Sequence, residues 1–155
     1  MKTERIALIL ARTAVVAALY AAITLLFAPI SYGVVQVRVS EALTILPFIM
    51  PESIIGLFIG CLIANIFGGL GFIDIVFGSL ATLVAAYLTG KMPNKYLAPL
   101  PPVLVNAVAV GLILKVVIGA PLLATMLYVA LGQLLACYVL GLPLLHWLKR
   151  YGWLK

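Results

Sequence analysis

Long apolar runs, interrupted by short segments rich in glycine, proline or charge, extend over almost the whole chain. A helix that crosses the hydrocarbon core of a membrane needs about 20 predominantly apolar residues, so the chain has room for about six such helices. The runs that predict them are Ile6–Phe27, Ala42–Met50, Ser53–Phe67, Phe72–Thr89, Val103–Ile118 and Leu122–Leu148. We therefore expect an all-α bundle of six transmembrane helices in a single membrane domain, residues 1–155.

Helix-breaking residues separate these runs. Pro29 should end the first helix, because proline cannot continue the hydrogen bonding of a helix. Glycines 68, 69 and 71 predict a turn after the third run, and Gly119 predicts the end of the fifth. The clearest loop is Lys91–Pro102, which carries four prolines.

Composition supports a membrane location. Hydrophobic residues make up 66% of the chain and charged residues 9%, and the mean hydropathy is +1.29. Soluble domains are roughly half apolar and a quarter charged. The chain is therefore expected to be an integral membrane protein with no separate soluble domain.

The basic residues flank the apolar runs, which argues against nucleic acid as the reason for the net charge of +6. They occur at the start, in the loop after the fourth run and at the end: Lys2, Arg5, Arg12, Lys91, Lys95, Lys149, Arg150 and Lys155. With six helices these three places share one side, and the positive-inside rule makes that side cytoplasmic. Both termini are then cytoplasmic, and only Arg38 and Lys115 lie toward the outside.

The segment between the first two runs is the most informative one for function. It places Gln36, Arg38 and Glu41 beside apolar runs, where an ionisable group usually marks a functional site. Residues 35–40 alternate between valine and polar residues, so an extended segment would put Gln36, Arg38 and Ser40 on one face. Because unpaired backbone is not tolerated against lipid, we expect residues 31–40 to form a lid over the outer mouth of the bundle.

Two simpler interpretations of that segment stay open. Ser40 could cap the next helix, with Glu41 favoured in its first turn by the helix dipole. Arg38 and Glu41 could also pair with each other, and such pairing is compatible with ligand binding.

A second acidic position opens the fourth run. Asp74, Gly78 and Thr82 have the spacing of one helix face, and the glycine leaves room beside the carboxylate. The simpler interpretation is a charge stabilised by the start of a helix. Since Asp74 is expected on the same outer side as Glu41, the two could share a pocket.

Amides inside apolar helices have two possible roles. Asn65, Asn106 and Gln133 could each hold neighbouring helices together, the commoner role. Asn65 lies near the outer end of its run and is the best pocket candidate. Asn106 is expected nearer the cytoplasmic end, which makes a pocket role doubtful.

A stripe of alanines follows one face of the first run. Its members are spaced by three or four residues: Ala7, Ala11, Ala14, Ala18 and Ala22. Small residues at this spacing let another helix approach closely in a membrane. The stripe therefore serves either packing within the bundle or docking of a partner protein.

The sequence offers no catalytic or metal-binding set. It has one histidine, His146, at the wrong end for a Ser-His-Asp arrangement, no HExxH and no Walker phosphate loop. Cys61 and Cys137 lie inside apolar runs and are expected to be buried free thiols. We expect neither enzymatic activity nor a cofactor.

Three stretches resemble one known family. PISYGVVQVRVSEALTILP, GLFIGCLIAN and DIVFGSLATLVAAYLTG resemble the QueT-type queuosine-precursor transporters. These are substrate-binding S components of energy-coupling factor (ECF) importers. The family pattern has a Pro-Ile-Ser-Tyr-Gly stretch followed by Gln-x-Arg-x-Ser-Glu-Ala, and both occur here.

The resemblance implies a partner system and a ligand class. S components have six helices, bind a vitamin-like ligand near the outer face, and dock on a transmembrane coupling subunit that two ATPases drive. By this likeness Ala14, Ala18 and Ala22 belong to the docking surface, in the plasma membrane of a prokaryote. The implied ligand is a 7-deazaguanine such as 7-aminomethyl-7-deazaguanine or queuine.

Such a ligand suits the chemistry of the polar residues. A carboxylate can accept the adjacent N–H and amino donors of a guanine-like edge as a bidentate pair, a role for Glu41 or Asp74. The other carboxylate could hold a cationic aminomethyl group, and Gln36, Arg38 or Asn65 could bind the ring carbonyl. Stacking on the ring falls to Tyr32 or Phe72.

Other functions stay open from the sequence alone. A stand-alone proton-coupled transporter could use Glu41 and Asp74 as relay carboxylates. An S component for another vitamin-like ligand, or a structural subunit without a ligand, would have the same apolar pattern.

Overall fold

The computed structural model describes residues 2–150, and every regular element within that range is helical. The elements are α1 (Lys2–Leu26), α2 (Ala28–Ser31), η1 (Val39–Phe48), α3 (Ser53–Phe67), η2 (Asp74–Gly78), α4 (Ser79–Gly90), α5 (Leu100–Ile118), α6 (Leu122–Leu134), η3 (Leu135–Gly141) and α7 (Leu142–Arg150). η1 is a 3₁₀ helix, and η2 and η3 are π-helical turns. The all-α prediction is confirmed for this part of the chain. Lys155, one of the basic residues used to predict the orientation, lies outside the described residues.

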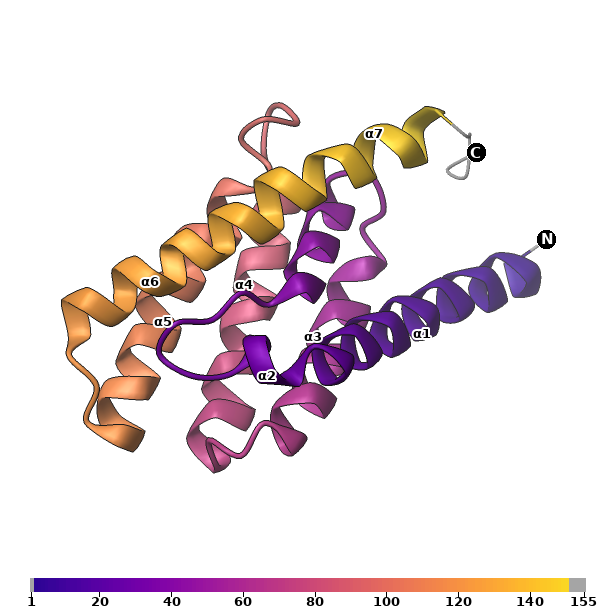
Figure 1. The fold of residues 1–155 in the computed structure, drawn as a ribbon. Coiled ribbons are helices and arrows are strands. Elements are labelled where there is room, and N and C mark those ends of the chain that lie inside the picture. Colours follow the sequence, from indigo (N-terminus) through magenta and orange to yellow (C-terminus); the bar gives the residue numbers. More distant parts are fainter. Residues whose placement is uncertain (1, 151–155) are drawn as a thin grey trace.

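Three helical stretches are long and apolar enough to cross a membrane. They are Thr3–Leu26, Leu100–Ile118 and the continuous rod Leu122–Arg150 made by α6, η3 and α7 (Figure 1). The chain is therefore a multi-pass membrane protein. Three shorter apolar helices, Val39–Phe48, Ser53–Phe67 and Asp74–Gly90, accompany them, and their membrane crossing stays a prediction.

The predicted helix breaks occur where backbone chemistry requires them. α1 ends at Leu26, and Pro29 sits in the first turn of α2. α5 ends at Gly119, whose φ of +70° is a left-handed conformation that glycine adopts without steric cost. The loop before α5 ends three residues earlier than expected, because Pro101 and Pro102 lie in the first turn of the helix, where proline is tolerated.

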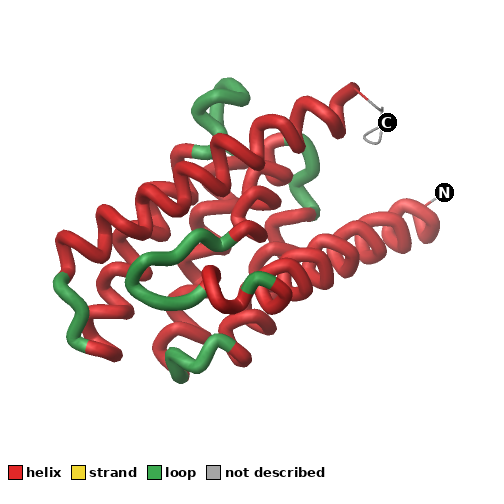
Figure 2. The backbone as a smooth tube through the Cα atoms, in the orientation of Figure 1, coloured by secondary structure: helices red, strands yellow, loops and turns green. Residues whose placement is uncertain are grey.

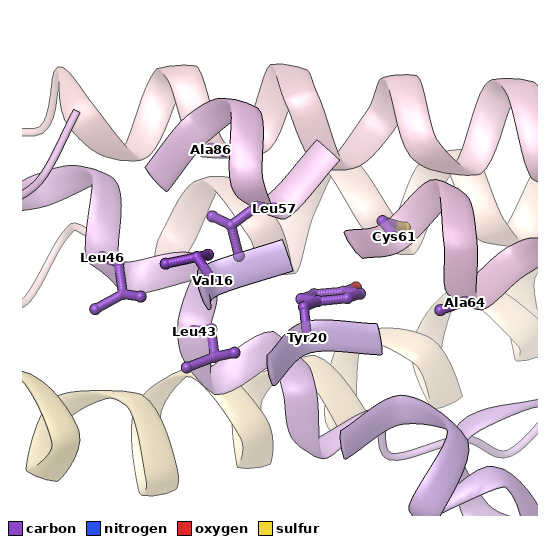
Figure 3. Packing of buried hydrophobic residues seen from close by; sticks show 8 residues of the cluster. All are labelled: Val16, Tyr20, Leu43, Leu46, Leu57, Cys61, Ala64 and Ala86. Carbon is purple, nitrogen blue, oxygen red and sulfur yellow. The ribbon is translucent and has the colours of Figure 1, made fainter. Parts of the chain in front are cut away.

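Glycines on α3 bring it close to α1. A Cβ on Gly56 would lie 2.7 Å from the Thr13 carbonyl oxygen, and one on Gly60 would lie 2.7 Å from that of Ala17. Next to this contact lies the main apolar core (Figure 3). It consists of Val16, Tyr20, Leu43, Leu46, Leu57, Cys61, Ala64 and Ala86. The core thus joins α1, α3, α4 and η1 around one buried tyrosine.

The alanine stripe of α1 faces away from this core. Ala7, Ala11, Ala14, Ala18 and Ala22 are all exposed. The face that packs inside the molecule carries Val16, Ala17, Tyr20 and Ala21 instead, each at most 7% exposed. Packing within the bundle, one of the two interpretations of the stripe, is therefore wrong.

η1 occupies the centre of the molecule. All eight residues from Ser40 to Pro47 are buried. At a rise of about 2.0 Å per residue, a 3₁₀ helix of ten residues covers about 20 Å. This extended winding lets a short run reach through the interior, with Glu41 in its first turn.

Candidate functional site

The loop between α2 and η1 supplies the first residues of the site. It runs across the bundle as the long central loop segment of Figure 2. Gln36, Arg38 and Ser40 are 7%, 8% and 0% exposed, whereas Val35 is 69% exposed. The period-two alternation therefore directs the polar side chains inward. The loop crosses α6 at Gly132, where a Cβ would collide with the Gln36 carbonyl oxygen.

Glu41 is held by two side chains from other helices. It is 1% exposed, and its Oε1 accepts a hydrogen bond from the Tyr20 hydroxyl at 2.5 Å. Its Oε2 accepts one from Asn106 Nδ2 at 3.2 Å. The carboxylate is thus fixed between α1 and α5 at the middle of the bundle.

Ser40 does not cap η1, contrary to one interpretation of the sequence. Arg38 is the residue before the first turn, and it makes no side-chain capping bond. The Ser40 hydroxyl instead forms a hydrogen bond with the Thr24 hydroxyl at 2.5 Å. Thr24 and Ser40 are both fully buried, so this hydrogen bond connects the start of η1 to α1 inside the molecule.

Arg38 is held by α3 and by an aromatic ring. Its Nη1 donates to Asn65 Oδ1 at 3.3 Å and to Cys61 Sγ at 3.8 Å. The guanidinium carbon lies 5.3 Å from the centre of the Tyr32 ring, an arrangement that favours the cation. No ion pair between Arg38 and Glu41 is recorded among the described residues, so direct pairing, one of the two interpretations left open by the sequence, is not formed in this conformation.

Tyr32 and Asn65 support this arrangement from outside the cavity. The Tyr32 hydroxyl donates to the Ala64 carbonyl at 2.7 Å, which fixes the ring that covers Arg38. Asn65 Nδ2 donates to the Asp74 carbonyl at 3.1 Å. Asn65 therefore links Arg38 on the loop to the π-helical turn η2.

Asp74 lies in η2, the π-helical turn at the start of the fourth helical stretch. Such turns occur often at functional sites. As the spacing predicted, Gly78 and Thr82 lie on the same side: a Cβ on Gly78 would be 2.6 Å from Asp74 Oδ1 and 2.9 Å from Asn65 Nδ2. The space left by the missing Cβ is filled by these two side chains.

These groups enclose a small polar cavity. It is lined by Gln36, Arg38, Glu41, Asp74, Gly78, Thr82, Asn106, Val110 and Gln133. Its volume is about 10 Å³, room for about one water molecule. The site is therefore closed in this conformation.

Two acceptors on the cavity have no partner among the described residues. They are Gln36 Oε1 and Asp74 Oδ2. Ser79 Oγ, which does not line the cavity, is also buried without a hydrogen-bond partner among the described residues. Buried polar atoms are almost always hydrogen-bonded, and an unsatisfied one costs about 1–3 kcal/mol. Unpartnered acceptors on two sides of one cavity are what a ligand with several N–H donors would satisfy.

The structure sorts the predicted site residues into three groups. Gln36, Arg38, Glu41 and Asp74 line the cavity, and Tyr32 and Asn65 contact Arg38 behind it. Phe72 is 76% exposed and does not line the cavity.

Three further residues belong to the site. Asn106 lines the cavity although its predicted depth argued against this; α5 begins at Leu100, so Asn106 lies about 9 Å inside the helix. Gln133 lines it from α6 and also accepts a hydrogen bond from Cys137 at 3.4 Å. Tyr20 could have been found as the sole aromatic residue of α1, since a buried tyrosine hydroxyl needs a partner.

Metal binding has no support in the described residues, where no group of three or more His, Cys, Asp or Glu side chains gathers. Cys61 and Cys137 are buried free thiols there, as expected. The chemistry available is hydrogen bonding and charge: two carboxylates, one guanidinium and several amides. An apolar helical bundle that encloses such a set is typical of membrane proteins that bind a polar small molecule.

Comparison with known proteins identifies the particular group. Residues 10–150 match the QueT transporter family, and the chain belongs to that family. The chain is 44% identical over 73 residues to the queuosine precursor transporter QueT of Lactococcus lactis subsp. cremoris (strain MG1363). That alignment covers 46% of this chain and 43% of the relative, so less than half of the relative's length is matched. No solved structure matches the chain.

Proposed function

We propose that this chain is the substrate-binding membrane subunit of an importer for a queuosine precursor, a 7-deazaguanine such as 7-aminomethyl-7-deazaguanine or queuine. Membership of the QueT transporter family supports transport, and the name of the similar protein supports this substrate class. The observation that carries the proposal is the closed cavity with its unpartnered acceptors, Gln36 Oε1 and Asp74 Oδ2.

The two carboxylates would take different parts of the ligand. Both oxygens of Glu41 already accept a hydrogen bond, whereas Asp74 Oδ2 accepts none. Asp74, with Gln36, is therefore the better acceptor for the adjacent N–H and amino donors of the guanine-like edge. Glu41 would balance the cationic aminomethyl group, and Arg38 would donate to the ring carbonyl.

Binding would require the cavity to open. An engineered cavity of about 150 Å³ can hold a benzene molecule, while this one has about 10 Å³. The segment most suited to move is residues 31–40, because its middle part forms no helix and lies directly over the cavity. We infer that it acts as a lid that opens to admit the ligand and then closes over it.

Energy would come from partner subunits of the ECF type. The exposed alanines Ala14, Ala18 and Ala22 give α1 a surface on which a helix of a transmembrane coupling subunit could pack closely. Two ATPase subunits would drive that complex in the plasma membrane of a prokaryote. Toppling or rotation of the docked subunit would then deliver the ligand inward. Both termini would be cytoplasmic, which agrees with α1 beginning and α7 ending on one side of the molecule (Figure 1).

A second candidate is a stand-alone proton-coupled transporter. The observation in its favour is the presence of two carboxylates, Glu41 and Asp74, on one cavity inside the bundle. Uptake of a labelled deazaguanine separates the candidates: an ECF importer requires the ATPases, whereas a proton-coupled carrier works without them and stops when the proton gradient is dissipated.

Binding to the purified chain tests the site directly. Glu41→Gln removes the charge assigned to the aminomethyl group and should weaken binding of 7-aminomethyl-7-deazaguanine by about 10-fold or more, since hydrogen bonds to charged groups contribute about 1.5–3 kcal/mol. The matched control is Glu52→Gln, which lies outside the cavity. If Glu41→Gln binds as well as wild type, the site assignment fails.

A further inference from the structure

A second pocket lies at the end of the molecule that carries the basic loop and the last helix. It has a volume of about 580 Å³ and is formed by the loop after α4 together with η3 and α7. Its lining includes Lys95, Tyr96, Tyr138, Leu142, His146 and Lys149. None of these residues belongs to the candidate substrate site.

The polar part of this pocket is cationic. Lys95 and Lys149 both line it, and no residue of its lining is acidic. Aromatic rings position both ammonium groups: Lys95 Nζ lies 4.9 Å from the centre of the Tyr96 ring, and Lys149 Nζ lies 5.0 Å from that of Phe48. Two positioned cations without a neighbouring carboxylate in the lining form a site for an anion.

The remaining wall of the pocket is apolar. Val139, Leu142, Pro143 and Leu145 come from the long C-terminal rod, whose outer side is exposed, with Val139 at 59%. In a membrane protein such a side lies against lipid tails. The lining also includes Tyr96 and Tyr138, and tyrosine is enriched at the boundary between lipid tails and headgroups.

We propose that this pocket binds an anionic phospholipid, with the phosphate between Lys95 and Lys149 and one acyl chain along Val139 and Leu142. The two lysines require an anionic headgroup, and the apolar wall matches a lipid tail. A soluble phosphate would use only the lysines. An acidic peptide would leave the apolar wall without a matching partner. Basic pockets at the ends of membrane helices are known to bind anionic headgroups in this manner.

Lipid titration of the purified protein tests the proposal. Protein in a neutral detergent is titrated with phosphatidylglycerol or phosphatidylcholine, and bound lipid is counted by native mass spectrometry. Each lysine near a membrane surface contributes about 1 kcal/mol to the binding of anionic lipid, which corresponds to about fivefold in affinity. Lys95→Gln with Lys149→Gln should therefore weaken phosphatidylglycerol binding by about 30-fold and leave phosphatidylcholine binding unchanged.

Lys91→Gln is the matched control. It lies in the same loop but outside the pocket, with its Nζ 5.4 Å from the centre of the Tyr87 ring, and should change phosphatidylglycerol binding by less than fivefold. All three lysines are exposed, so unchanged helical circular dichroism is expected. Equal affinity for the two lipids, or no loss in the double variant, would overturn the proposal. Displacement of the lipid by equimolar glycerol 3-phosphate would assign the pocket to a soluble phosphate instead, and displacement by a glutamate-rich peptide would assign it to a protein partner.

Discussion

Replacing Asp74 with asparagine separates ligand binding from stability. In the closed site Asp74 Oδ2 is buried and accepts no hydrogen bond from a described residue. When the ligand is absent, this atom costs rather than contributes free energy, by about 1–3 kcal/mol. Asp74→Asn places a neutral amide there, so the ligand-free protein should be as stable as wild type or more stable.

The same change should weaken binding. A hydrogen bond between the ligand and an ionised carboxylate contributes about 1.5–3 kcal/mol, which corresponds to a loss of about 10- to 150-fold in affinity. Affinity is measured by titration calorimetry with 7-aminomethyl-7-deazaguanine, and stability by the melting temperature without ligand. Glu52→Gln controls for the loss of a carboxylate outside the cavity. Unchanged affinity would refute the role of Asp74 as a ligand acceptor, and a lower melting temperature would refute the cost assigned to its unpartnered oxygen.

Three further changes test the surroundings of the cavity and the cytoplasmic side. Gly78→Ala places a Cβ 2.6 Å from Asp74 Oδ1, about 0.8 Å closer than ordinary contact at 3.4 Å. We expect the free energy of unfolding to fall by about 1–3 kcal/mol and ligand binding to weaken. An unchanged affinity would contradict this. Tyr20→Phe leaves Glu41 Oε1 without its hydroxyl donor and should lower the free energy of unfolding by about 1–3 kcal/mol, measured by thermal denaturation. Burial raises the pKa of Glu52, but the hydrogen bond and charge of Arg12, together with a backbone hydrogen bond, outweigh burial and hold that pKa below its usual value. The contribution of this bridge, about 0–1 kcal/mol, is therefore present at neutral pH and lost as the pH falls through the lowered pKa. Glu52→Gln and wild type should differ in melting temperature at pH 7 and converge in acid, and a difference that grows in acid would exclude this cause.

The alternation in the loop before η1 was the most predictive feature of the sequence. A period of two is independent of what surrounds the segment, so Gln36 and Arg38 could be placed on one face in advance. The spacing of Asp74, Gly78 and Thr82 was equally local. The partners of these residues depend on how helices pack, which no local pattern contains.

Asn106 and Tyr20 illustrate the part that could not be predicted. Asn106 lies deeper than the sequence predicts, because two prolines that resemble loop residues form the first turn of α5. Tyr20 meets Glu41 where α1 lies against the buried η1, while Gly60 of α3 packs closely on the same stretch of α1, so this meeting depends on the packing of three helices. The 3₁₀ winding of η1 also changes the rise per residue, so the depth of Glu41 could not be counted from an ideal α-helix.

Equilibrium binding of 7-aminomethyl-7-deazaguanine to the purified wild-type chain, measured by titration calorimetry, tests the central claim most directly. The account predicts saturable one-to-one binding at micromolar or lower concentration, with adenine, which lacks the adjacent N–H and amino donors, failing to compete. Absence of binding by any 7-deazaguanine at micromolar concentration, or equal binding of adenine, would contradict it.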